Sequence, residues 1–268
     1  MPRKTSKPDY ENNPFFIASS GITKFANMAQ SIFVVFIALA LLGLLSNGFS
    51  PDVSQDSIKH AISTVSAWSL HDWLVAIGSG SIIGLAWALI SALLSGVSAY
   101  TSAMLAHGRH VSLKKAFREA FDNLWSYLWL QAIICIRLFL WSLLFIIPGV
   151  IMYFRYSLAS VAFFDESKNL RGNAAINESL RLTKNGWITT YAANVLFNFL
   201  TLFAITNIIT TSVNAVLYRQ FDAAGDKKPQ THWLSWLTLV GPFAVLGVLV
   251  FFAATAAVIV TLLGIKSH

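Results

Sequence analysis

Two arginines stand inside apolar runs and are the residues best placed to do chemistry. Arg137 lies near the middle of residues 124–147, and Arg155 lies seven residues after Pro148 in the next run. An arginine at mid-bilayer depth costs about 2.5–3.5 kcal/mol on insertion scales, so each side chain should face protein, water or a lipid head group. A guanidinium group matches phosphate geometry bidentately. One hypothesis is therefore that the two arginines bind an anionic ligand such as a lipid phosphate.

A second hypothesis is that the helix bundle itself satisfies both arginines. Backbone carbonyls near Pro148 could accept hydrogen bonds, as could the amides of Asn194, Asn198 and Asn207. Asn194 and Asn198 are four residues apart and share one helix face, which favours a polar seam between helices. Snorkelling to the interface would suit Arg155 better than Arg137. The ligand and structural hypotheses both remain open from the sequence.

The remaining ionisable residues give little basis for catalysis. Every Asp and Glu lies outside the apolar runs, and adjacent Asp165 and Glu166 would point about 100° apart on a helix. These two acids are expected to end an apolar run at the water interface. His107 and His110 would need further ligands to hold a metal ion. The sequence therefore predicts no enzyme, no metal site and no cofactor; an intramembrane enzyme would require Asp165, Glu166, His107 and His110 to converge.

The composition indicates a membrane protein. The 268 residues are 56% hydrophobic and only 12% charged, with a mean hydropathy of +0.62. Soluble domains carry about 25% charged residues, so much of this surface should face lipid. The net charge of +7 fits cytoplasmic basic loops and attraction to anionic lipid better than nucleic-acid binding. Cys135 is the only cysteine, which excludes an internal disulfide.

The predicted fold is an all-α polytopic bundle of about six transmembrane helices, because a bilayer core needs roughly 20 apolar residues per helix. A cytoplasmic segment with an interfacial helix (1–28) would precede a single transmembrane domain (29–264) and a short tail (265–268). The predicted spans are residues 31–45, 82–106, 124–147, 150–164, 189–209 and 237–263. Pro148 and Gly149 are expected to form the turn between spans three and four. Span four covers only about 22 Å, so a re-entrant hairpin with five crossings is the alternative.

Basic residues distribute unevenly between the two sides of such a bundle. Six crossings put thirteen Lys and Arg residues on one side and four on the other, the four being Lys59, Arg219, Lys227 and Lys228. The positive-inside rule then predicts a multi-pass protein of the cytoplasmic membrane with both termini inside.

Three similar segments precede spans one, three and five: residues 13–27, 111–123 and 172–186. Their apolar spacing predicts amphipathic helices lying in the membrane plane. The residues expected at the water edge are Lys114, Lys115, Arg118, Arg181, Lys184 and Trp187. The simplest architecture is three copies of one unit, made of an interfacial helix, a span and a return span. The alternative is that any cytoplasmic loop tends to be basic and amphipathic.

The stretch 143–187 carries the most distinctive pattern. It contains Ile147-Pro148-Gly149, then Arg155-Tyr156, the acidic pair Asp165-Glu166, and a predicted amphipathic helix from Ala175 to Lys184 before Trp187. This pattern resembles the membrane domain attached to some bacterial glycerophosphodiester phosphodiesterases and the related YciC-like uncharacterised integral membrane proteins. In those enzymes the chemistry belongs to a separate soluble barrel, and the spans are expected to use up this chain. The resemblance therefore implies the membrane part without an activity.

These observations predict an integral membrane protein without evident catalytic machinery. Its expected partners are membrane lipids, above all anionic phospholipid, in a structural or envelope-homeostasis role, and an oligomer is an option. The alternative function is transport of an amphiphile or small anion by means of Arg137 and Arg155.

Overall fold

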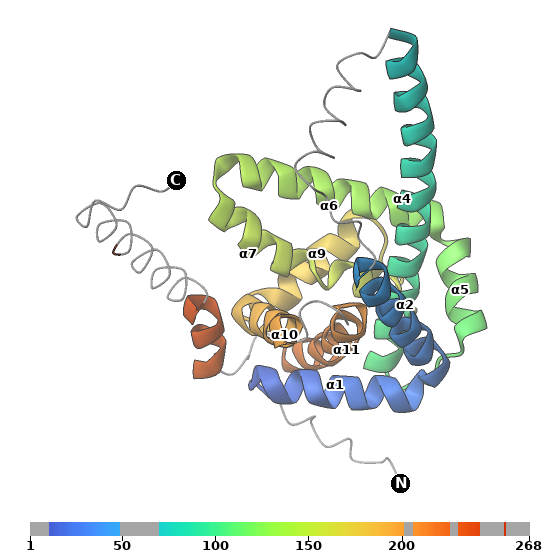
Figure 1. Ribbon diagram of the computed structural model, residues 1–268. Helices are drawn as coiled ribbons and strands as arrows, with labels where there is room; N and C mark the ends of the chain where they lie inside the picture. Colours follow the sequence, from blue (N-terminus) through green and yellow to red (C-terminus); the bar gives the residue numbers. More distant parts are fainter. Residues whose placement is uncertain (1–10, 49–69, 201–205, 226–229, 242–254, 256–268) are drawn as a thin grey trace.

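The computed structural model describes residues 11–48, 70–200, 206–225, 230–241 and 255, and every regular element in these ranges is a helix (Figure 1). Residues 233–241 are also helical. The helices with their bounds are α1 (Pro14–Met28), α2 (Gln30–Gly48), α4 (Leu70–Ala106), α5 (Leu113–Asp122), α6 (Leu124–Leu144), α7 (Ile146–Tyr156), α8 (Ala159–Phe163), α9 (Asn173–Thr183), α10 (Trp187–Leu200) and α11 (Thr206–Ala224).

The described helices that are long and apolar enough to cross a membrane number three. They are residues Ala88–Ala106, Leu124–Leu144 and Ile147–Phe164, and the pair α1–α2, bent by 114°, would make a fourth. The three single helices coincide in position with predicted spans two, three and four, whereas the bent pair contains both the predicted interfacial segment 13–27 and the start of predicted span one. Most of the predicted span 237–263, and residues 201–205 of span five, lie outside the described residues.

Helices α1, α5 and α9 coincide with the three segments predicted at 13–27, 111–123 and 172–186, and their bounds differ from the predicted ones by at most three residues. Asn13 caps α1, because its Oδ1 accepts a hydrogen bond from the Phe15 amide at 3.0 Å. Ser112 caps α5 in the same way, accepting from the Lys115 amide at 3.4 Å. Such side-chain caps satisfy amides that have no partner within the first turn. Each of α1, α5 and α9 leads within a few residues into the next long helix.

The predicted turn at Pro148 and Gly149 is displaced by a few residues. Phe145 is the extended residue that separates α6 from α7, and Pro148 lies in the first turn of α7. A proline is tolerated there because a first-turn amide has no acceptor within the helix. Gly149 instead lets α7 approach α6, since a Cβ at this position would lie 2.5 Å from the Ser142 hydroxyl oxygen.

The described part of the predicted span 189–209 falls on α10 and on the first residues of α11, and residues 201–205 between them lie outside the described residues. α11 continues to Ala224, well beyond the predicted span, and packs against both α10 and α4. Arg219 on α11 lines the same small cavity as Lys24 of α1, although the sequence placed these two residues on opposite sides. Asp222 likewise pairs with Lys168. The C-terminal end of α11 therefore lies on the side that holds the basic segments.

The helices form three consecutive units, each made of a first helix, a second helix and a return helix, and α11 is the return helix of the third unit. The three units are α1–α2–α4, α5–α6–α7/α8 and α9–α10–α11. The first helix of each unit packs on the return helix of another unit: α5 on α4, α9 on α8, and α1 on α11. Figure 1 shows α1 running across the end of the bundle beneath α10 and α11. This cyclic packing closes the bundle between its first and third units.

The core lies along α11, which is buried on nearly all sides. Its buried side chains include Thr211, Ser212 and Asn214 as well as aliphatic and aromatic residues. The hydroxyls of Thr211 and Ser212 donate to carbonyls one turn earlier, at 2.6 Å each. By contrast, α6 is more apolar and its side chains are mostly exposed. Burying the polar helix and exposing the apolar one is the arrangement that suits a lipid solvent.

Candidate functional site

Arg137 donates a hydrogen bond to a residue that was not among its predicted partners. Its Nη2 donates to the Asn173 Oδ1 at 3.1 Å. Asn173 is the first residue of α9, so this predicted interfacial helix begins beside the middle of α6. The contact supports the structural hypothesis for Arg137, but with an acceptor other than the predicted amides.

Arg155 is also tied to α9, mainly through its backbone. Its Nη2 donates to the Leu180 carbonyl at 3.4 Å. Its own carbonyl accepts from the hydroxyls of Ser179 at 2.7 Å and Thr183 at 3.1 Å. The Arg155 Nε is buried and has no hydrogen-bond partner. Both arginines thus donate a hydrogen bond to α9.

Asn194 and Asn198 both lie on α10, as predicted. Asn194 is buried, and its Nδ2 donates to the Thr190 carbonyl at 2.9 Å within the same helix. The side chain of Asn198 lies outside the described part of the structure, so the polar seam between helices stays a prediction.

The predicted water-edge residues fall into two groups. On α5, Lys114, Lys115 and Arg118 are exposed, and the Lys115 Nζ lies 5.9 Å from the centroid of the Tyr100 ring. On α9, Arg181 is exposed, but its Nε and Nη2 each donate to the Glu178 carboxylate at 2.8 Å. Lys184 is exposed and Trp187 is half-buried. Arg181 is therefore committed to a protein partner, whereas the α5 cations face outward.

A charged network joins α9 to α11 next to this surface. Lys168 donates to the Glu178 carboxylate at 2.7 Å and to the Asp222 carboxylate at 2.6 Å. Hydrogen bonds from Arg181 lower the pKa of Glu178 to about 2; burial opposes this shift, and Lys168 adds to it. The network fixes the end of α9 to the end of the central helix.

A polar node lies where the three return helices end. The Asp165 Oδ1 accepts from the Ser167 amide at 2.9 Å and hydroxyl at 2.6 Å, and lies 3.0 Å from the His107 Nε2. Its Oδ2 accepts from the Tyr218 hydroxyl at 2.7 Å. His107 follows α4, Asp165 follows α8, and Tyr218 belongs to α11. Burial would raise the pKa of the Asp165 carboxyl, but hydrogen bonds from Ser167 and Tyr218 and the charge of His107 lower it.

The convergence that an intramembrane enzyme would require is met by one pair only. His107 meets Asp165, but Glu166 instead pairs with Arg109 at 3.1 Å, and the side chain of His110 is exposed. Because both oxygens of Asp165 already accept hydrogen bonds, this carboxylate joins the helix ends. Within the described residues, no three His, Cys, Asp or Glu side chains are grouped to hold a metal ion.

A groove of about 660 Å³ opens between the first half of α6 and the start of α9. It is lined by Asn123, Trp125, Ser126, Trp129, Phe163, Arg171 and Gly172. Trp125 and Trp129 are 78% and 68% exposed. The Arg171 Cζ lies 4.6 Å from the centroid of the Phe163 ring, so the guanidinium is held against an aromatic wall. Arg171 is one of the basic residues between predicted spans four and five, and nothing near it in the sequence shows that Phe163 lies under its side chain.

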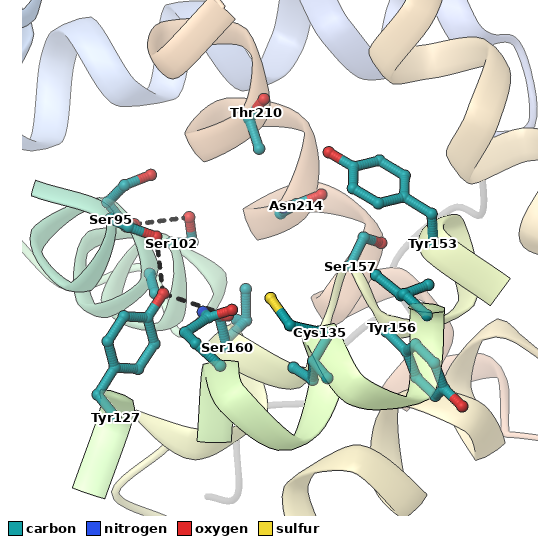
Figure 2. A pocket seen from close by; sticks show the side chains of 16 residues that line it. Ser95, Ser102, Tyr127, Cys135, Tyr153, Tyr156, Ser157, Ser160, Thr210 and Asn214 are labelled. Carbon is teal, nitrogen blue, oxygen red and sulfur yellow. Dashed lines mark hydrogen bonds between the residues drawn. The ribbon is translucent and has the colours of Figure 1, made fainter. Parts of the chain in front are cut away.

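A cavity of about 280 Å³ lies between the three return helices and α6 (Figure 2). Its polar walls come from Ser95, Ser98, Ser102, Tyr127, Gln131, Tyr153, Tyr156, Ser157, Ser160, Thr210 and Asn214. An adjoining cavity of about 330 Å³, lined also by Asn194, shares Tyr153, Ser157, Thr210 and Asn214 with it. Neither Arg137 nor Arg155 lines either space. This site could not be predicted from the sequence, because serines and threonines in apolar runs have no distinctive spacing.

Comparison of the chain with family models, with curated proteins and with solved structures gives no match. The resemblance of residues 143–187 to the phosphodiesterase membrane domain accordingly stays a prediction.

Proposed function

We propose that this protein is an integral membrane protein that binds anionic phospholipid through the groove between α6 and α9. The observation that carries the proposal is the placement of the Arg171 guanidinium against Phe163, in a groove whose outer wall is Trp125 and Trp129. Tryptophan side chains favour the level of the lipid head groups, and arginine binds phosphate bidentately. A phosphate at Arg171 would leave the acyl chains beside the exposed indoles.

Arg137 extends the same site along α6. Its partner Asn173 follows Gly172, which lines the groove, so the two guanidinium groups flank the start of α9. No side chain caps the N-terminus of α9, and the helix dipole there favours an anion. In this proposal Arg137 keeps the ligand role that its position in an apolar run first suggested, with Asn173 orienting it. Arg155 has a structural role, because both its carbonyl and its Nη2 are bonded to α9.

The exposed cations of α5 provide a second, less specific attraction. Lys114, Lys115 and Arg118 are exposed on α5, which packs on α4. Near an anionic membrane surface each such residue contributes about 1 kcal/mol of binding. We infer that α1, α5 and α9 lie along the cytoplasmic face and that lipid contact there has a structural or envelope-homeostasis role.

The positions of α11 and the residues after it bear on the topology. The Asn12 Nδ2 donates to the Gln230 carbonyl at 2.9 Å, and the Tyr191 hydroxyl donates to the Thr238 carbonyl at 3.2 Å. The run 237–263 thus starts on the side of the N-terminal segment. If it crosses the membrane, the C-terminus lies outside rather than inside, and an alkaline phosphatase fusion at residue 268 will be active.

The lipid proposal is tested by native mass spectrometry of protein released from nanodiscs that contain phosphatidylglycerol and phosphatidylcholine. Wild type should retain phosphatidylglycerol, and Arg171→Gln and Arg137→Gln should each retain several-fold less. Arg109→Gln is the matched control, because that exposed arginine pairs with Glu166 away from the groove. Equal retention by wild type and both groove variants, with all proteins folded, would overturn the proposal.

Transport of an amphiphile or small anion remains the alternative function. The polar cavity between the return helices supports this alternative. The predicted role of Arg137 and Arg155 in transport has no such support, because neither residue lines the cavity. Any transported group would therefore meet hydroxyls and amides rather than cations.

A further inference from the structure

The cavity between the return helices is polar and carries no fixed charge. Among the described residues that line the two adjoining spaces there is no Asp, Glu, Lys, Arg or His. Hydroxyls and amides make up the polar part of the wall, and aliphatic side chains such as Ile134 and Leu138 make up the rest. Without a compensating charge, an ion would lose its hydration here and gain only neutral hydrogen bonds, which is unfavourable. The lining selects for an uncharged occupant.

Several polar side chains of the wall are hydrogen-bonded to neighbouring side chains. The Ser95 and Tyr127 hydroxyl oxygens are 2.7 Å apart, and the Gln131 Nε2 donates to the Ser160 hydroxyl at 3.0 Å. The Ser98 and Thr211 hydroxyl oxygens are 2.5 Å apart. These bonds tie α4, α6, α8 and α11 together and hold the cavity walls in place.

Asn214 brings a buried, unpaired acceptor to this wall. It is only 6% exposed, and its Oδ1 is buried with no hydrogen-bond partner. Asn214 lines both spaces, together with Tyr153, Ser157 and Thr210. Figure 2 shows Asn214, Ser157 and Cys135 around the same space. Leaving a buried acceptor unpaired costs about 1–3 kcal/mol, so an occupant that donates a hydrogen bond to it gains that energy back.

We propose that this cavity binds an uncharged polyhydroxyl group, either a free polyol or the sugar head group of an amphiphile. Such a group donates to the Asn214 carbonyl oxygen and exchanges hydrogen bonds with the serine and threonine hydroxyls, which both donate and accept. The volume equals that of roughly nine water molecules in the liquid, which suits a small molecule or head group. The site is separate from the anionic groove and stands independently of it.

Cys135 provides a reporter for this site, because it lines the cavity and is the only cysteine in the chain. The experiment follows alkylation of the full chain by N-ethylmaleimide in phosphatidylcholine nanodiscs. The additives are glucose, octyl glucoside, inorganic phosphate and octyl phosphocholine. Glucose or octyl glucoside should slow the reaction in a saturable way, whereas phosphate and octyl phosphocholine should not. Protection by both sugars identifies a free polyol as ligand, and protection by octyl glucoside alone identifies an amphiphile.

Variants separate the proposed site from indirect effects. Asn214→Leu should weaken protection by about three- to tenfold, which is the effect of losing one hydrogen bond to a neutral ligand. Asn177→Leu is the matched control, since Asn177 is exposed on α9. Thr210→Val tests the same wall should Asn214→Leu fail to fold.

Three outcomes would overturn the proposal. The first is that neither sugar protects Cys135, which would mean that the cavity holds water only. The second is that phosphate protects Cys135 as well as glucose does, which would mean that the site is not selective for uncharged groups. The third is that Cys135 reacts in dodecyl sulfate but not in nanodiscs, which would mean that the cavity is closed to water-soluble ligands.

Discussion

Replacing the two neighbouring carboxylates Asp165 and Glu166 one at a time tests whether the polar node holds the helix ends together. Asp165 is 1% exposed and accepts hydrogen bonds through both oxygens, whereas the Glu166 side chain is 49% exposed and pairs with Arg109. The substitutions Asp165→Asn and Glu166→Gln remove one charge each and keep the side-chain shape. Burial is therefore the main difference between the two variants.

The expected free-energy changes follow from these contacts. A hydrogen bond to a charged group contributes about 1.5–3 kcal/mol and a neutral one about 0.5–1.5 kcal/mol, so each bond that survives in Asp165→Asn weakens by about 1 kcal/mol. The new Nδ2 also turns one acceptor into a donor that faces Tyr218, Ser167 or His107. Together these changes should destabilise the protein by about 2–4 kcal/mol. Glu166→Gln should cost about 0–1 kcal/mol, as exposed ion pairs do.

The assay is equilibrium unfolding in mixed micelles, followed by tryptophan fluorescence for wild type and both variants. If Asp165→Asn and Glu166→Gln destabilise the protein equally, the hydrogen bonds at Asp165 contribute no more than a surface ion pair. The node would then not be what joins the ends of α4, α8 and α11.

Three further predictions concern the charged network, the closure of the bundle and the cavity wall. The pKa of Glu178 is lowered from 4.5 to about 2. The ionised carboxylate therefore adds at most roughly 3 kcal/mol to the free energy of unfolding, and this contribution is fully present above pH 4.5. That contribution should disappear as the pH falls to about 2, and thermal unfolding of Glu178→Gln should lack this part of the acid sensitivity. Gly21→Ala should destabilise the protein by about 1–3 kcal/mol, because the added Cβ would lie 2.7 Å from the Ser212 carbonyl oxygen. Gly241→Ala, where a Cβ meets open space, should be neutral or stabilising in the same melting assay. Tyr127→Phe removes the hydroxyl between α4 and α8 and should lower the free energy of unfolding by about 1 kcal/mol. An unchanged free energy of unfolding would mean that these hydrogen bonds do not stabilise the bundle.

The apolar helices could be predicted from the sequence because their signal is local. The mostly apolar helix α6 has 21 residues, Leu124–Leu144, and the predicted run 124–147 exceeds it by three. The predicted run 82–106 ends where α4 ends, at Ala106. The caps Asn13 and Ser112 are equally local features. In each case the physical cause, burial in lipid or pairing of a first-turn amide, acts within a few residues of chain.

The central helix could not be predicted in the same way. Hydropathy finds helices that face lipid, and α11 faces protein, so its Thr211, Ser212 and Asn214 lower the very signal used to find it. The hydrogen bonds of Arg137 and Asp165 are also long-range. Arg137 bonds to Asn173, 36 positions away, and Asp165 bonds to Tyr218, 53 positions away. No spacing rule within a helix anticipates such pairs.

The cyclic packing gives a physical reason for the polar character of α11. α11 packs against α1 on one side and against α4, α8, α9 and α10 on its other sides, so little of it is left for lipid. Apolar side chains gain nothing from leaving lipid for such a position, whereas hydroxyls and small residues allow close backbone approach and interhelical hydrogen bonds. The Ser102 hydroxyl, 3.0 Å from the Thr211 carbonyl oxygen, and the contact of Gly21 with Ser212 show both effects at the centre of the bundle. The same requirement leaves hydroxyls facing the space where the three return helices do not meet, and the cavity around Asn214 follows from how the three units close.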